Sequence, residues 1–351
     1  MTAKYRIPFL VIGALFVVWG VLGLIDRRDR PYGGFSNGLD YVINEVEEGS
    51  PAEAAGLKVG DRIITYNGIS VEDARAYRQM PGPQIGETRV LVVERTAETT
   101  LAAGEVTPVT HEIALTYGPR PAGYIALSWA FFIVGLCFIG FGLLAYIKAP
   151  SRPAMLLAVA GLCMGISILS GPYIGSYTLR AIVNSIVLVL ELLGFGAFLH
   201  LLMVFPKRKA FLGRAHATKM LYAPIVLIAL FALWLTIFVS QRTGTFNTVV
   251  NVIYGVFSVV YLSLALVALI HSFVKATPDE RSRYGLNLML AGLIIAVLPI
   301  IVIWLVSIFA PNVIVPGSDF LVLVAVFIPI TMALAVMKAG AAAAPEPAPV
   351  M

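Results

Sequence analysis

Charged side chains are scarce in this 351-residue chain. Asp, Glu, Lys and Arg make up 13% of it, whereas hydrophobic residues make up 59%. Soluble globular domains carry about 25% charged residues, so the composition excludes a chain that is soluble throughout. The two cysteines, Cys137 and Cys163, both lie in apolar runs. They provide no disulfide framework for the charged part of the chain, and we interpret them as small packing residues.

Histidine is also scarce, and the sequence lacks the motifs of the common enzyme classes. None of the four histidines, His111, His200, His216 and His271, belongs to an H-E-x-x-H zinc motif. The sequence also has no P-loop, no dinucleotide-binding glycine fingerprint and no CxxCH haem motif. An intramembrane serine protease would require Ser167 and His271 to meet at one depth, which we do not expect. We therefore predict no enzymatic activity, no cofactor and no metal.

Long apolar runs are abundant. About 20 apolar residues span the hydrocarbon core of a bilayer, and eight runs approach or exceed that length: Ile7–Ile25, Ala122–Ile147, Pro153–Gly171, Leu179–Phe205, Met220–Ser240, Thr248–Phe273, Gly285–Phe309 and Phe320–Met337. We predict an α-helical polytopic membrane protein with an N-terminal transmembrane anchor (1–25), an exported domain (26–120), a seven-helix transmembrane domain (121–338) and a disordered Ala/Pro tail (339–351). The first run resembles a signal peptide that is retained, because Asp26-Arg27-Arg28 is a poor cleavage site.

Basic residues predict the orientation of these helices. If the N-terminus is cytoplasmic, the cytoplasmic ends and short loops hold 13 basic residues, against two, Arg180 and Arg242, in the short loops of the other side. The positive-inside rule then places both termini in the cytoplasm and residues 26–120 on the periplasmic or extracellular side. The net charge of +5 arises from these cytoplasmic flanks. It indicates contact with anionic lipid headgroups rather than with nucleic acid.

The polar segment between the first two runs is rich in turn signals. Gly49–Gly68 reads GSPAEAAGLKVGDRIITYNG. Ser50 is placed to cap a short helix that has Pro51 in its first turn and ends at Gly56. Lys58–Gly60 predicts a tight turn, Arg62–Tyr66 a strand, and Asn67-Gly68 a two-residue hairpin turn. We also predict strands at Leu39–Glu45, Arg89–Glu94 and Glu112–Tyr117, a helix at Val71–Met80 capped by Ser70, and a long hairpin at Thr96–Thr110.

The order GSPAxxAGLxxGDxIxxxNG resembles the core of a bacterial PDZ domain of the HtrA type, over about a quarter of the chain from Tyr32 to Tyr117. The resemblance implies an exported β-rich domain that binds a protein terminus or an extended segment. In that family the peptide carboxylate sits on backbone N–H groups of a glycine-containing loop, and the peptide adds a strand beside a helix. It also implies a bacterial cytoplasmic membrane as the location.

The matching positions give a candidate peptide-binding site. The loop is Tyr32-Gly33-Gly34-Phe35, which makes Gly33, Gly34 and Phe35 the candidate carboxylate-binding residues, and Ala74 and Tyr77 belong to the groove helix. The spacing departs from the usual bacterial pattern, because only a few residues, Ser36 and Asn37 among them, separate Phe35 from the start of the next predicted strand. An alternative interpretation of Tyr32–Asn37 is a linker that leaves the membrane.

Three polar residues lie in the fourth apolar run. Glu191 is nearest to its centre, Asn184 lies two turns away on much the same face, and His200 lies near the cytoplasmic end. Ionisable residues inside a membrane are costly and mark functional candidates. Glu191 is either part of a proton or ion relay or a protonated side chain bonded to a neighbouring helix. We interpret His200 as a structural, hydrogen-bonded residue.

A second resemblance concerns the helices. His200 is followed by Phe205-Pro206 and basic residues, and this pattern is similar to the seven-helix sensor region of competence-type histidine kinases. Asp279–Pro299 and the last run with Pro329 fit the same pattern. In those kinases a catalytic region follows the last helix, whereas here Ala339–Met351 is a short Ala/Pro tail. The resemblance implies a sensor module without its own kinase.

Two functions fit these features. The first is a non-enzymatic sensor, scaffold or adaptor whose exported domain binds a protein segment and whose helices engage another membrane protein. The second is a transporter-like protein with an accessory peptide-binding domain, suggested by Glu191, Asn184 and helices that Pro224, Pro299 and Pro329 would interrupt.

Overall fold

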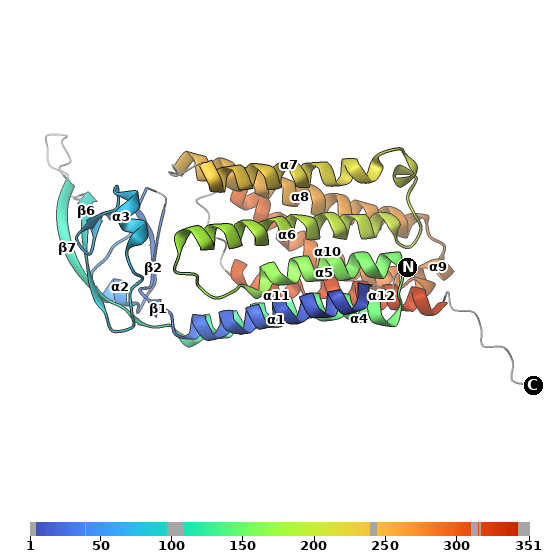
Figure 1. Ribbon diagram of the computed structural model, residues 1–351, viewed down its shortest axis with the longest axis horizontal. Helices are drawn as coiled ribbons and strands as arrows, with labels where there is room; N and C mark the ends of the chain where they lie inside the picture. Colours follow the sequence, from blue (N-terminus) through green and yellow to red (C-terminus); the bar gives the residue numbers. More distant parts are fainter. Residues whose placement is uncertain are drawn as a thin grey trace, which may run out of the picture.

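The computed structural model describes residues 5–38, 40–96, 108–238, 244–309, 315 and 317–342. These residues form a bundle of long helices with a small β-rich domain at one end (Figure 1). Eight described segments are long and apolar enough to cross a membrane. Seven are the single helices α1 (Arg6–Arg28), α4 (Ala122–Lys148), α5 (Arg152–Leu169), α6 (Tyr177–Val204), α7 (Ala217–Phe238), α8 (Gly244–Lys275) and α10 (Leu286–Phe309), and the eighth contains α11 (Leu321–Val324) and α12 (Phe327–Ala342).

Two of the three prolines expected to interrupt helices do not do so. Pro224 lies inside α7 and Pro299 inside α10, and both helices are continuous through them. The break in the last span falls at residues 325–326, and Pro329 follows in the first turn of α12, where its missing N–H costs no helical hydrogen bond. The same helix corrects the predicted tail, because residues 339–342 continue α12.

Short connecting helices lie at the end of the bundle that is farthest from the β-rich domain. They are the 3-10 helix η2 (Ala210–Gly213) and α9 (Pro278–Arg283), while the 3-10 helix η3 (Ser318–Phe320) directly precedes α11. Thr277 caps α9 in a reciprocal capping box with Glu280. The start of α1 and the end of α12 also lie at this end of the bundle (Figure 1).

The first helix is an integral part of the bundle. The residues of α1 that are buried are three glycines, Gly13, Gly20 and Gly23. A Cβ atom at Gly23 would lie 2.2 Å from the carbonyl oxygen of Ser170, and one at Gly20 would lie 3.0 Å from the Leu169 side chain. Helices approach each other closely where such small residues line the contact, so α1 packs tightly against the end of α5.

The described residues of the β-rich domain form three small sheets. A four-stranded antiparallel sheet has the order β5-β4-β6-β7, β2 pairs with β3, and β1 pairs with β8. Its elements are β1 (Pro31–Tyr32), β2 (Phe35–Asn37), β3 (Ile43–Val46), α2 (Pro51–Ala54), β4 (Arg62–Tyr66), β5 (Ile69–Ser70), α3 (Ala74–Gln79), β6 (Thr88–Thr96), β7 (Pro108–Thr116) and β8 (Gly118–Pro119). The predicted strands at 89–94 and 112–117 are thus parts of a longer β6–β7 hairpin, whose tip lies outside the described residues.

The local signals in Gly49–Gly68 are confirmed. The Ser50 hydroxyl accepts a hydrogen bond from the Glu53 N–H, and Pro51 starts α2. Asn67 and Gly68 have φ values of 51° and 78° and join β4 to β5. Positive φ at both central residues is the geometry of a type I′ hairpin turn. Gly60 has a φ of 92°, as the predicted turn requires.

Two predicted element boundaries are wrong. The helix predicted at Val71–Met80 begins at Ala74, because the Asp73 carboxylate caps the Ala76 N–H while Ser70 accepts from Glu72 in the preceding turn. The strand predicted at Leu39–Glu45 begins only at Ile43, after a turn in which Tyr41 has a φ of 62°. Leu39 itself lies outside the described residues.

The β-rich domain has a hydrophobic core of its own. It consists of Ile43, Ala52, Leu57, Ile63, Tyr66, Val71, Leu91, Val93, Ile113, Leu115 and Tyr117. The fully buried Asp61 carboxylate lies at the edge of this core and accepts hydrogen bonds from Arg95 at 2.6 and 2.7 Å and from the Lys58 N–H at 2.9 Å. The Asp61–Arg95 pair therefore fastens the turn before β4 to strand β6.

A paired stalk joins this domain to the bundle. The chain enters the domain through β1 and leaves it through β8, and these strands pair with Pro31 opposite Pro119. At the foot of the stalk, the Asp26 carboxylate accepts hydrogen bonds from Arg30 (2.7 Å to Nε) and from the Tyr173 N–H (3.1 Å). The stalk is thus anchored to the end of α1 and to the connection between α5 and α6.

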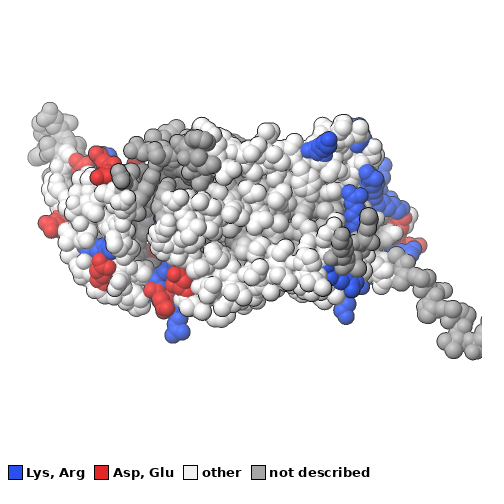
Figure 2. All heavy atoms as spheres, in the orientation of Figure 1, with Lys and Arg blue, Asp and Glu red and all other residues white. Residues whose placement is uncertain are grey.

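Charge is distributed unevenly along the molecule. Figure 2 shows Lys and Arg side chains gathered at the end of the bundle that is farthest from the β-rich domain, whereas the long flanks are almost free of charge. Charges of both signs appear on the β-rich domain and at its junction with the bundle. An uncharged belt between two charged ends is the surface that a membrane-spanning bundle presents.

Candidate functional site

The loop Tyr32–Phe35 is folded onto the β-rich domain. The Gly33 carbonyl accepts a hydrogen bond of 2.9 Å from the Ala52 N–H in the first turn of α2, and the Gly34 carbonyl accepts one of 2.9 Å from the Glu47 N–H. Gly34 has a φ of 75°. A Cβ atom there would lie 2.1 Å from the Cβ of Ser50, so the loop closes directly over the cap of α2. The segment is therefore not a free linker.

Strand β2 continues this loop and has an open edge. Within the described part of the chain, β2 pairs with β3 alone. Gly34 and Glu47 are a hydrogen-bonded pair, and Phe35 lies opposite Val46 in the next position. Because bonding alternates along an antiparallel ladder, the N–H and C=O groups of Phe35 point away from β3. These groups can pair with an added strand.

The side chains around this edge belong to the domain core. Phe35 of β2 and Tyr77 and Met80 around the end of α3 all pack against the same hydrophobic cluster. The Tyr77 ring meets the rings of Tyr41 and Tyr66 edge-on, at centroid distances of 5.8 and 6.1 Å. Burial raises the pKa of the Tyr77 hydroxyl, so this side chain is neutral. The predicted site residues Phe35 and Tyr77 are thus brought to one cluster.

The remaining predicted groove residue is Ala74. It is the first residue of α3, and its side chain lies outside the described part of the structure. The candidate site therefore consists of the Gly33–Gly34 loop, the open edge of β2, and helix α3 with Tyr77.

Sequence reasoning missed a polar contact between this loop and the bundle. The two oxygens of the Glu47 carboxylate accept hydrogen bonds from the hydroxyls of Tyr32 and Tyr124, each 2.5 Å long. Burial and the bond to Glu47 raise the pKa of Tyr32 well above its ordinary value, so its hydroxyl remains a donor. Tyr124 belongs to α4. Nothing in the local sequence relates Glu47 to Tyr124, which is 77 residues away.

Glu191 has hydrogen-bond partners on two other helices. Ser167 of α5 donates a bond of 2.7 Å to one carboxylate oxygen, and Tyr254 of α8 donates one of 2.5 Å to the other. Glu191 also lines a cavity of about 260 Å³ whose other walls are mainly apolar, including Phe195 and Trp304. The contacts favour the interpretation of Glu191 as a residue bonded between helices. The cavity beside it is the feature that fits the alternative, a proton or ion relay.

Asn184 and His200 lie at other levels of α6 than Glu191. Asn184 lines a second cavity of about 290 Å³ near the β-rich domain, together with Trp19 and Arg180, and Ser167 lines both this cavity and the one at Glu191. His200 is buried, with Nδ1 lying 3.3 Å from the Tyr222 hydroxyl and Nε2 lying 3.5 Å from Arg152. These contacts favour the interpretation of His200 as a structural residue.

The residues that a serine protease would need are separated. Ser167 is bound to Glu191, whereas His271 lies beside Lys209, with 3.2 Å between Lys209 Nζ and His271 Nδ1. Among the described residues, no group of three or more His, Cys, Asp and Glu side chains is arranged to hold a metal ion.

Comparison with known proteins identifies part of the chain. The family model described as "PDZ domain" matches residues 42–95. Relatives include the Na(+)/H(+) exchange regulatory cofactor NHE-RF2 of Oryctolagus cuniculus, which is 40% identical over 87 residues, covering 23% of this chain and 28% of the relative. The same protein of Mus musculus is 38% identical over 94 residues, covering 25% and 28%.

A third relative, PDZ domain-containing protein 7 of Homo sapiens, is 55% identical over 40 residues, covering 11% of this chain and 4% of the relative. The chain therefore spans little more than a quarter of the length of the first two relatives, and no solved structure matches it. The family match begins after the Gly33–Gly34 loop and ends within β6. Residues 42–95 of this chain belong to a PDZ domain.

Proposed function

We propose that the PDZ domain binds the C-terminus or an extended segment of another protein, and that the chain acts as a non-enzymatic scaffold, adaptor or sensor. PDZ domains are protein-binding modules, and one of the relatives matched here is a PDZ domain-containing protein. In this binding mode an extended peptide adds a strand to an exposed sheet edge.

The open edge of β2 beneath the Gly33–Gly34 loop carries this proposal. The main-chain groups of Phe35 point away from β3, and the loop supplies the N–H groups of Gly33 and Gly34 at the head of the strand. A carboxylate that accepts several such N–H groups is held by charge-assisted hydrogen bonds, which are about twice as strong as neutral ones.

We also propose that the bundle spans a bacterial cytoplasmic membrane, with both termini in the cytoplasm and the PDZ domain in the periplasmic or extracellular space. Support comes from the eight apolar segments and from the basic side chains at the end that is farthest from the PDZ domain. The helices would then engage a second membrane protein, as the helices of a membrane sensor region do. The bilayer itself is the other partner, and nucleic acid is not.

Peptide binding to the purified full-length protein tests the proposal. A displayed library of random peptides with free C-termini supplies the probe, and the affinity of the selected peptide is measured by fluorescence anisotropy. Converting its terminal carboxylate to an amide should weaken binding by about tenfold or more. Equal affinity of both forms would exclude the carboxylate mode, and failure to select any peptide would contradict peptide binding altogether.

A pair of tryptophan substitutions tests the position of the groove. Ala74→Trp at the start of α3 should abolish binding of the selected peptide, whereas Gln79→Trp at the exposed end of the same helix should leave it unchanged. Both variants must retain the unfolding temperature of the wild type. If Ala74→Trp binds normally, the groove does not run beside the start of α3.

The cavity at Glu191 favours a second candidate function, a transporter-like role with the PDZ domain as an accessory. Glu191 is bonded to Ser167 and Tyr254 at the wall of a cavity, and intramembrane carboxylates of this kind mark ion and proton pathways. Glu191→Gln keeps the shape and removes the charge. If this variant abolished a proton or ion flux of the wild type in liposomes, the transporter role would replace the scaffold role.

A further inference from the structure

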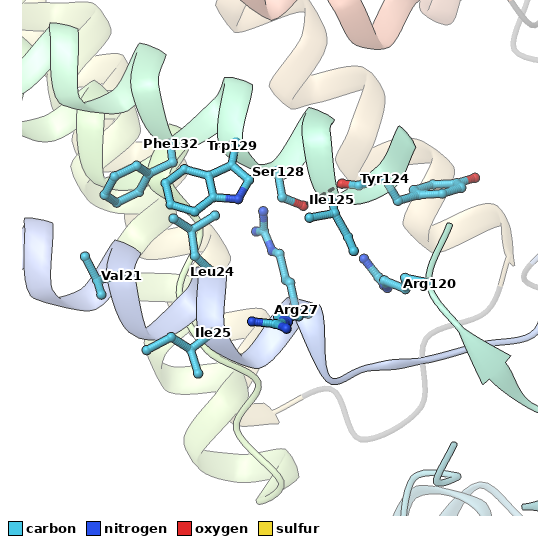
Figure 3. A pocket seen from close by; sticks show the side chains of 11 residues that line it. Val21, Leu24, Ile25, Arg27, Arg120, Tyr124, Ile125, Ser128, Trp129 and Phe132 are labelled. Carbon is cyan, nitrogen blue, oxygen red and sulfur yellow. Dashed lines mark hydrogen bonds between the residues drawn. The ribbon is translucent and has the colours of Figure 1, made fainter. Parts of the chain in front are cut away.

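A cavity of about 340 Å³ lies between α1 and α4, next to the stalk of the PDZ domain. Figure 3 shows that one wall is apolar, with Leu24 and Ile25 from α1 facing Trp129 and Phe132 from α4. The other wall is cationic and consists of Arg27 and Arg28 from the last turn of α1 and Arg120 from the segment before α4. The cavity is therefore amphipathic.

Two acidic residues, Asp26 and Asp29, flank Arg27 and Arg28 in the sequence. The Asp26 carboxylate is bound to Arg30 and to the Tyr173 N–H. Across the described residues, no carboxylate forms an ion pair with Arg27, Arg28 or Arg120. Burial lowers the pKa of the Arg120 guanidinium, and the charge of Arg30 lowers it further, while Tyr124 and Asp26 offset part of this shift. Arg27 and Arg120 are partly buried, whereas Arg28 is exposed. Like charges that are partly buried are costly unless an anion joins them.

Local helix electrostatics explain only part of this arrangement. Basic side chains in the last turn of a helix interact favourably with its carbonyl end, which accounts for Arg27 and Arg28. Arg120 precedes α4 and gains nothing from that effect. It reaches the same cavity because β1 and β8 pair and bring residue 120 beside the end of α1.

The apolar wall indicates what kind of anion fits. Ile25 and Trp129 are 59% and 53% exposed, so the cavity opens onto the outer surface of the bundle rather than into its core. A Trp side chain beside arginines at a helix end is typical of the level of lipid headgroups. A free inorganic anion would leave the Leu24 and Phe132 side of the cavity unfilled, whereas an amphiphile covers both walls.

We propose that this cavity binds an anionic phospholipid, with the headgroup phosphate on Arg27 and Arg120 and an acyl chain along Leu24, Trp129 and Phe132. Guanidinium groups suit phosphate because their planar donors form paired hydrogen bonds with its oxygens. The inference rests on the proposed membrane location and not on peptide binding by the PDZ domain.

Tryptophan quenching by brominated lipid tests the inference in the full-length protein. Trp19, Trp234 and Trp304 are replaced by Phe, so that Trp129 is the remaining tryptophan. The protein is reconstituted in phosphatidylcholine nanodiscs that contain a low mole fraction of brominated phosphatidylglycerol. Saturable quenching should exceed that produced by the same fraction of brominated phosphatidylcholine. Equal quenching by the two lipids would overturn the proposal, because the headgroup would then not be recognised.

Variants then identify the side chains that recognise the headgroup. Arg27→Gln combined with Arg120→Gln should shift half-maximal quenching to an about tenfold higher fraction of phosphatidylglycerol. Arg180→Gln removes one positive charge beside another cavity at this end of the bundle and should have no effect. Wild-type behaviour of the double variant would overturn the assignment. If the double variant does not fold, Arg27→Lys with Arg120→Lys keeps the charges, loses the paired donors and should weaken quenching to a smaller degree.

Competition experiments distinguish the other occupants. Inorganic phosphate at moderate concentration should not relieve the quenching, whereas relief would identify the cavity as a site for a free anion. The peptide selected for the PDZ domain should not relieve it either, and relief would assign the arginines to peptide binding. Quenching by neutral brominated lipid provides a separate test of membrane insertion, so failure of the membrane location and failure of headgroup recognition give different results.

Discussion

The hydroxyl of Tyr124 donates a hydrogen bond of 2.5 Å to the carboxylate of Glu47 and so connects α4 to the PDZ domain. The backbone N–H of Glu47 in turn donates to the Gly34 carbonyl at 2.9 Å. One residue therefore contacts both the bundle and the loop proposed to hold a peptide carboxylate.

Removing the Tyr124 hydroxyl should loosen this loop. Tyr124→Phe deletes one hydrogen bond, and such bonds are worth about 0.5–1.5 kcal/mol. We expect amide hydrogen exchange at residues 33–36 to increase about two- to tenfold, with little change in the core strands β4 and β6. Tyr173→Phe, on the same side of the bundle, is the control. Unchanged exchange at residues 33–36 would show that the loop is held by the PDZ domain alone.

Substitution of Gly34 should destabilise the PDZ domain as well as block its loop. A Cβ atom would lie 2.1 Å from Ser50 Cβ. Gly49 is a matched control, because its φ of 70° is similar to the 75° of Gly34 and nothing lies within 4 Å of its Cβ position. Gly34→Ala should lower the unfolding free energy by about 2 kcal/mol more than Gly49→Ala.

The clash can be relieved from the other side. Ser50→Gly removes the clashing Cβ and costs the cap of α2 only a few tenths of a kcal/mol. The double variant Gly34→Ala with Ser50→Gly should therefore be more stable than Gly34→Ala alone. Additive losses in chemical denaturation would contradict contact between the two residues.

Substitutions at Gly60 test the effect of backbone strain alone, because a Cβ atom there would meet no neighbouring atom. Its φ is 92°, and no atom lies within 4 Å of its Cβ position. Gly60→Val should destabilise the PDZ domain by about 1–3 kcal/mol, because a β-branched residue is strongly disfavoured at positive φ. Gly60→Asn should cost less, since Asn tolerates this region better. Thermal unfolding of residues 31–119 measures both, and equal melting temperatures of Gly60→Val and the wild type would refute the turn.

Loss of Arg95 should destabilise the PDZ domain because it leaves the buried Asp61 carboxylate without its ion-pair partner. Arg95→Met leaves the fully buried carboxylate with the Lys58 N–H as its remaining partner. We expect a loss of about 3 kcal/mol in the unfolding free energy, because breaking a buried pair from one side is more costly than removing both charges. Asp61→Asn combined with Arg95→Met should recover part of that loss. A double variant less stable than Arg95→Met would contradict this explanation.

The proposed orientation predicts which side of the membrane each segment faces. A cysteine introduced at Ser36 should react with a membrane-impermeant maleimide in intact cells, whereas one at Ala343 should react only after the cells are permeabilised. Cys137 and Cys163 are replaced by Ala in both variants. Labelling of the Ala343 variant in intact cells would refute the topology.

Short-range features of the fold could be predicted from the sequence because their causes are local. The Ser50 cap, the Asn67-Gly68 turn and the eight apolar segments each depend on neighbouring residues. The start of α3 was wrong because Ser70 and Asp73 are both good caps, and only the structure shows which one bonds to the helix. Pro224 and Pro299 were misleading because a long packed helix can continue through a proline.

The partners of the site residues could not be predicted, because they come from distant parts of the chain. Glu191 meets Tyr254 of α8, and Arg120 reaches the end of α1 through the pairing of Pro31 with Pro119. A single sequence gives no information on the crossing of α5, α6 and α8. It indicated that Glu191 needs a partner but not which helix supplies one.

The pairing of β1 with β8 also limits how the PDZ domain can move. The two chain connections to the bundle run side by side as a hydrogen-bonded pair. The domain cannot rotate about its own long axis without separating these strands. A pull on a bound peptide would therefore act on the ends of α1 and α4 together, because the paired strands β1 and β8 connect directly to these two helices.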